Sequence, residues 1–100
     1  MNANTNDGVM ALKKAAYNGD AVRLKALIAA GADVNAEDKD GWSALMLAGQ
    51  GGHLDCVKAL IAAHADVNAK DQWDLRPLMN AAFAGSVECV KALIAAGACE

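Results

Sequence analysis

The six-residue segment Lys-Ala-Leu-Ile-Ala-Ala occurs three times in this 100-residue chain, at 25–30, 58–63 and 91–96, each copy 33 residues after the last. Other residues keep the same step, among them Leu12, Leu45 and Leu78, and Gly19, Gly52 and Gly85. A fixed period of this length is typical of a stacked array, in which each repeat buries its apolar face only against its neighbours. The period therefore predicts three stacked repeats.

The second repeat shows how one unit folds. Ser43 can cap a short helix that runs to about Gln50, because its hydroxyl can accept a backbone N–H that would otherwise be unpaired. A pair of glycines ends this helix, and a second helix follows with apolar residues on one face: Leu54, Val57, Leu60 and Ile61. The polar stretch 66–74, rich in turn formers, then connects this helix to the third repeat. The sequence predicts an all-α repeat of helix, turn, helix and hairpin-like loop.

This pattern resembles the ankyrin repeat family over nearly the whole chain from about Gly8. The matching segments are Gly-Ala-Asp-Val-Asn-Ala at 31–36, Gly41 with Ser-Ala-Leu at 43–45, the run 52–58, Pro77-Leu78 and Ala81-Ala82. The resemblance implies a solenoid whose hairpins project to one side, with a concave face of hairpins and first helices. The chain departs from the family where Lys13, Met46 and Met79 stand in place of its histidine, so we expect marginal stability.

The repeats divide the chain into four predicted segments: a flexible N-terminus at 1–7, a cap-like first repeat at 8–36, a second repeat at 37–69 and a third at 70–100. The first repeat is cap-like because Lys14 and Arg23 stand where the second repeat has Leu47 and Cys56. Polar residues at these positions suit an outward-facing terminal repeat.

The third repeat has no such polar change, and its residues Val87, Val90 and Ile94 are typical of an interior repeat. We therefore expect its downstream side to be apolar and exposed. Two explanations stay open at this point. Either the chain is a piece of a longer array, which is the simpler explanation, or this side meets a partner or a second copy of the chain.

Charge and composition exclude several function classes. Nine Lys and Arg against twelve Asp and Glu leave a net charge of −3, without the basic stripe that a nucleic-acid binder needs. The chain contains no run of eighteen apolar residues, so the sequence predicts no membrane span. Three cysteines without Cys-x-x-Cys spacing suit a reducing compartment, so we expect the protein in the cytoplasm.

No constellation in the sequence predicts catalysis, a metal or a cofactor. The cysteines Cys56 and Cys89 lie one repeat apart, too far for a disulfide, and are expected to be small buried apolar residues. His64 replaces a helix-ending glycine, a position where a positive φ is usual, so its role is predicted to be structural.

All four aromatic residues fall outside the second-helix core positions. The resemblance places them on the concave surface, and aromatic side chains are enriched where proteins bind one another. The predicted protein-binding residues are Tyr17, Asn18, Lys39, Asp40, Trp42, Gln50, Gln72, Trp73, Leu75 and Phe83. The alternative is that Trp42 and Trp73 pack over the hairpins and Phe83 covers the next repeat, so that one or two of the four are structural.

Two functional hypotheses follow. The first is a non-catalytic protein-binding module that uses its concave face. The second is a structural or self-associating fragment of a longer ankyrin array, with a homodimer formed through its apolar C-terminal repeat. The resemblance also implies that the asparagine of the Asp-Val-Asn-Ala runs, here Asn35 and Asn68, is a candidate substrate for an asparaginyl hydroxylase.

Overall fold

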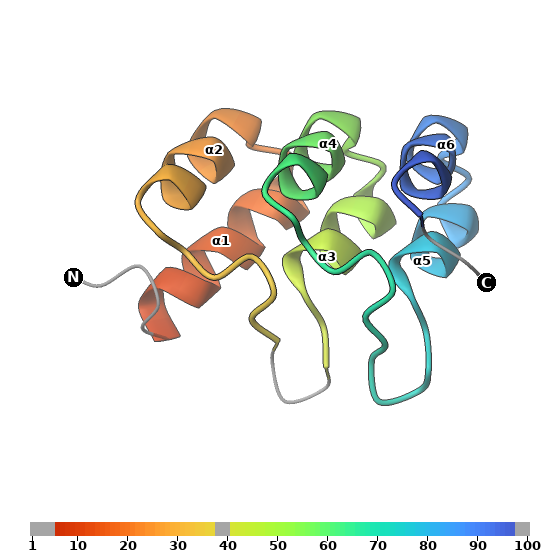
Figure 1. Cartoon of the computed structure of the whole chain (residues 1–100), viewed down its shortest axis with the longest axis horizontal. Coiled ribbons are helices and arrows are strands. Elements are labelled where there is room, and N and C mark those ends of the chain that lie inside the picture. The colour runs from red at the N-terminus through yellow and green to blue at the C-terminus, as the bar shows by residue number, and fades with distance from the viewer. Residues whose placement is uncertain (1–5, 38–40, 98–100) are drawn as a thin grey trace.

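The computed structural model describes residues 6–37 and 41–97 (Figure 1). In these residues the chain forms six helices and no strand: α1 (Asn6–Asn18), α2 (Ala21–Ala29), α3 (Ala44–Gly51), α4 (Leu54–Ala62), α5 (Pro77–Phe83) and α6 (Val87–Ala95). The first helices of the three repeats form one row in Figure 1, and the second helices form a parallel row. This arrangement confirms the predicted all-α solenoid of stacked helix pairs.

Local sequence signals set the helix ends. The Ser43 hydroxyl accepts a hydrogen bond from the Met46 backbone N–H at 3.4 Å and caps α3, as predicted. Pro77 occupies the first turn of α5, where the N–H that it lacks would have no helical partner. The helix α1 begins at Asn6, so residues 6 and 7 are helical although the sequence placed them in the flexible N-terminus. Asp7 is a residue type that helix N-termini favour.

The core runs along the array between the two rows of helices. Each repeat contributes an equivalent buried leucine on its first helix: Leu12, Leu45 and Leu78. On the second helices Leu60 and Leu93 are fully buried, as are Leu24 and its equivalent Val57. Small residues allow the first helices to approach closely. A Cβ on Gly49 of α3 would lie 3.4 Å from the backbone oxygen of Pro77 in α5, so α3 and α5 pack nearly backbone to backbone.

The loops between repeats project to the same side of the array, below the first helices in Figure 1. The loop between α4 and α5 is hairpin-like, because the Asp71 backbone N–H donates to the Leu75 oxygen at 3.0 Å. The carboxylate of Asp71 accepts hydrogen bonds from the Trp73 and Leu75 N–H groups at 2.8 and 2.9 Å. These contacts hold the loop in a defined shape.

Two loop positions have a left-handed backbone without glycine. His64, which follows α4, has φ 67°, where the equivalent Gly31 and Gly97 have φ 95° and 98°. Asp74 has φ 62°, where the equivalent Gly41 has φ 84°. The structural role predicted for His64 is therefore confirmed: it provides the turn that ends its repeat's second helix.

Candidate functional site

A pocket of about 300 Å³ lies between α3 and α5, next to the loops that lead into these helices. Its lining includes four of the predicted site residues, Trp42, Gln50, Leu75 and Phe83, together with Asn80 and Ala84. Trp42 and Leu75 are one repeat apart, as are Gln50 and Phe83. Because α3 and α5 pack side by side, equivalent positions of adjacent repeats come together here. We call these six residues the α3–α5 pocket.

The sequence analysis missed two residues of the α3–α5 pocket, Ala84 and the polar Asn80. The Asn80 side chain is only 4% exposed, and its Nδ2 is buried without a hydrogen-bond partner in the described part of the chain. The equivalent residues are Lys14 in the first repeat and Leu47 in the second. Comparison of the three repeats at this position would have singled out an amide where the neighbouring repeat has leucine.

The predicted residues differ in how much of their surface is exposed. Trp73 and Tyr17 are 61% and 57% exposed, and Phe83 at the pocket itself is 74% exposed. Gln72 is also exposed, whereas Trp42 and Leu75 are half-buried. The predicted residues Lys39 and Asp40 lie outside the described residues. Three of the four aromatic side chains therefore present most of their surface to solvent.

Two family models match the chain. The model described as ankyrin repeats in three copies matches residues 1–71, and the model of a single ankyrin repeat matches residues 75–99. The chain belongs to the ankyrin repeat family. Ankyrin repeats are in general protein–protein interaction modules and in general non-catalytic. No curated protein matches the chain.

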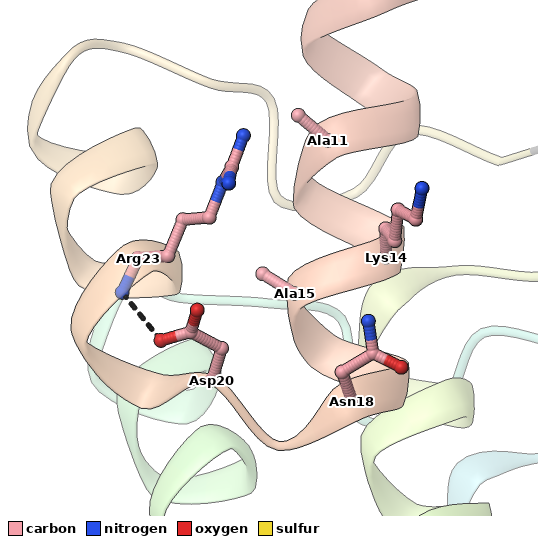
Figure 2. Close-up of a pocket in the computed structure, with 6 residues that line it drawn as sticks. All are labelled: Ala11, Lys14, Ala15, Asn18, Asp20 and Arg23. Atoms are coloured by element: carbon pink, nitrogen blue, oxygen red, sulfur yellow. Dashed lines mark hydrogen bonds between the residues drawn. The ribbon is translucent and has the colours of Figure 1, made fainter.

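The first ankyrin repeat has a polar outer end, which Figure 2 shows in close-up. A pocket of about 190 Å³ is lined there by Ala11, Lys14, Ala15, Asn18, Asp20 and Arg23. The Asp20 carboxylate accepts a hydrogen bond from the Arg23 backbone N–H at 3.1 Å and so caps α2. Asn18, a predicted site residue, therefore lines this end of the array rather than the α3–α5 pocket.

The first ankyrin repeat differs from the others in burial as well as in charge. Arg23 is exposed, while Cys56 and Cys89 at the equivalent positions of the later repeats are buried. These positions face the preceding repeat where there is one. The basic side chains Lys14 and Arg23 thus belong to the upstream end of the described array.

The third ankyrin repeat exposes an apolar surface, as the sequence predicted. We call its residues the downstream face: Leu78, Met79, Ala82, Val87, Val90 and Ile94. They line two adjoining pockets of about 350 and 440 Å³. Ile94 is 56% exposed and Met79 37%, whereas Met46, the equivalent of Met79 in the second repeat, is fully buried.

Cys56 and His53 have structural positions in this ankyrin array. Burial raises the pKa of the Cys56 thiol, and the negative charges of Asp55 and Asp20 raise it further, so Cys56 is a poor nucleophile. The His53 ring Nε2 lies 2.9 Å from the Tyr17 backbone oxygen and links two repeats. In the described residues, no group of His, Cys, Asp or Glu side chains could hold a metal ion. None of the helices described is long and apolar enough to span a membrane.

Proposed function

We propose that this chain is a non-catalytic module that binds a protein partner through its concave face, with the α3–α5 pocket at the centre of the contact. The observation that carries the proposal is the grouping of Trp42, Gln50, Leu75 and Phe83 around one pocket, next to the exposed Trp73. We also place the module in the cytoplasm, on the support of its free buried thiols at Cys56 and Cys89.

The energetics favour contact through these aromatic side chains. Phe83 and Trp73 are both more than half exposed, and covering apolar surface stabilises a complex by about 25 cal/mol per Å² before the costs of association. Aromatic side chains also have few rotatable bonds, so they lose little conformational entropy when a partner covers them. A partner segment that covers this patch removes from water the largest exposed side chains of the face.

The experiment is a selection of peptides from a displayed library of short random sequences on the folded chain. The affinities of the selected peptides are then measured for the wild type and for the variants Trp73→Ala and Phe83→Ala. Val22→Ala is the control, because Val22 is 83% exposed on α2, away from the face. We expect each aromatic truncation to weaken binding by about tenfold or more, with an unchanged circular dichroism spectrum. Equal binding by all variants would contradict the proposal.

The downstream face supports a second candidate function, self-association into a homodimer. Met46 and Val57 of the second repeat are buried where the third repeat packs on them, and the downstream face presents the equivalent Met79 and Val90. The upstream end carries Lys14 and Arg23, so it is a poor complement for an apolar surface. A second copy of the chain is therefore expected to bind face to face, downstream side against downstream side.

Light scattering coupled to size-exclusion chromatography over a wide concentration range tests this candidate. We expect a dimer whose population rises with concentration and which Ile94→Glu abolishes. Val22→Glu is the matched control, since Asp55 and Glu88 already occupy the equivalent position in the later repeats. A monomer at every concentration, or a dimer that Ile94→Glu leaves intact, would rule out this interface and leave concave-face binding unaffected.

A further inference from the structure

The α3–α5 pocket contains a buried hydrogen-bond donor with nothing to donate to. The Nδ2 atom of Asn80 has no partner in the described part of the chain, and the side chain is 4% exposed. A buried amide without a hydrogen bond destabilises the folded state, because it has lost its contacts with water. An acceptor supplied from outside the chain would recover that loss on binding, once the Asn80 side chain turns its Nδ2 toward the pocket that it lines.

The other residues of the pocket restrict what can bring this acceptor. Trp42, Leu75, Phe83 and Ala84 provide an apolar wall, and Gln50 is the second amide. None of the six lining residues carries a charge, so a carboxylate or phosphate bound here would be desolvated against amide donors alone, without a cation. Burying a charge in that way is strongly unfavourable. The chemistry of the pocket therefore selects an uncharged acceptor.

We propose that the α3–α5 pocket binds an uncharged peptide segment of the partner, in which an apolar side chain packs between Trp42 and Phe83 and a neighbouring carbonyl oxygen accepts a hydrogen bond from Asn80 Nδ2. This inference rests on the concave face being the binding surface. The volume of the α3–α5 pocket, about 300 Å³, is at the lower end of the range for pockets that bind small ligands. Such a pocket suits one apolar side chain and its adjoining peptide group.

The chain provides its own comparison for this role. Leucine stands at the equivalent position of the second repeat, where Leu47 is half-buried on α3. The fold therefore accommodates leucine at this position, and Asn80→Leu removes the unpaired amide without introducing a foreign side chain. We expect this variant to unfold at a higher temperature than the wild type, because an unsatisfied polar group is replaced by an apolar one.

Peptides selected from the displayed random library are the probe. The selected sequences are expected to have an apolar residue and no essential Asp or Glu, and Asn80→Leu is expected to weaken their binding by about tenfold. Val22→Leu is the control, since it introduces the same leucine side chain at a position of α2 that is 83% exposed and outside the predicted binding residues; it should leave binding unchanged. If the selected peptides needed an acidic side chain for binding, the proposal that the pocket selects an uncharged acceptor would be overturned.

A second measurement uses the wild-type protein alone. The side-chain NH₂ resonances of Asn80 in a ¹⁵N-correlated NMR spectrum should shift downfield as peptide is added, because the group gains an acceptor. Resonances that stay in place, or equal affinities for the wild type and Asn80→Leu, would overturn the role of Asn80. If Phe83→Ala still weakens binding in that case, the concave face remains the binding surface; insensitivity to both substitutions would remove the proposed function as well.

Discussion

The side-chain oxygen of Asn35 accepts a hydrogen bond from the backbone N–H of Asp66 at 2.6 Å. The two residues lie 31 positions apart in the sequence, in the loops that follow the first and second repeats. The Asn35 N–H in turn donates to the carboxylate of Asp33 at 2.9 Å, which holds the loop in a turn. Consecutive loops are therefore joined by a side chain as well as by the packing of helices.

Asn35→Ala should destabilise the array. The substitution removes the acceptor of the Asp66 N–H, so we expect the free energy of unfolding to fall by about 1 kcal/mol. Urea denaturation followed by circular dichroism measures the change. Asn18→Ala serves as the control, because Asn18 is exposed on α1 and its replacement should stay within about 0.5 kcal/mol. Equal stabilities of the two variants would show that the inter-loop bond contributes nothing.

His64→Gly should stabilise the protein. His64 holds φ 67°, a conformation in which a side chain is strained and glycine is not, so we expect a gain of about 1 kcal/mol in unfolding free energy. The reciprocal change Gly31→His tests the same cause, since nothing lies within 4 Å of a Cβ at Gly31. It should lower the stability by a similar amount. A loss of stability in His64→Gly would mean that the imidazole has favourable contacts that outweigh the strain.

Gly41→Ala should cost more than Gly31→Ala, although both glycines have a positive φ. A Cβ on Gly41 would lie 2.9 Å from the Asp71 Cα in the next loop, and a backbone atom can move away only by shifting that loop. We expect a loss of about 2 kcal/mol or more for Gly41→Ala and about 1 kcal/mol for Gly31→Ala. Thermal unfolding of both variants measures the difference, and equal losses would argue against close packing of the loops.

The thiol of Cys56 should make the protein less stable at alkaline pH. Burial, with the nearby charges of Asp55 and Asp20, raises the pKa of Cys56 above 9.0, so the folded chain holds this proton more tightly than the unfolded chain. The stability that the protonated thiol contributes is present below pH 9.0 and is lost as the pH rises through the pKa of the folded state.

Urea denaturation of the wild type and of Cys56→Ala at about pH 8 and about pH 10 tests this dependence. The wild type should lose more stability than the variant between the two conditions, because only the wild type has this thiol to ionise. Parallel losses in both proteins would assign the alkaline destabilisation to other groups.

Much of this fold could be predicted from the sequence because the same sequence pattern occurs in all three repeats. The 33-residue step, the Ser43 cap and the Pro77 start each act within one repeat, so local physical chemistry is enough to place the helices. The apolar downstream face was also accessible, since comparison of the repeats shows which one lacks polar substitutions.

The candidate site was harder to predict because it forms between repeats. The pairing of Trp42 with Leu75 and of Gln50 with Phe83 follows from the period, but burial of Asn80 without a partner depends on how closely α3 and α5 approach. Asn18 illustrates the converse. The sequence predicts Asn18 as a binding residue beside the aromatic side chains, whereas successive residues of a helix point in different directions, and Asn18 lines the pocket at the upstream end.

The α3–α5 pocket spans a junction of the solenoid, since its two walls belong to different repeats that pack against each other. Binding at this pocket, as proposed, is therefore thermodynamically linked to stacking: a bound segment favours the stacked arrangement of the second and third repeats, and binding weakens as the unstacked form becomes populated. A module that binds as proposed has affinity only while these two repeats are stacked, so occupancy of the pocket would report on the integrity of the array.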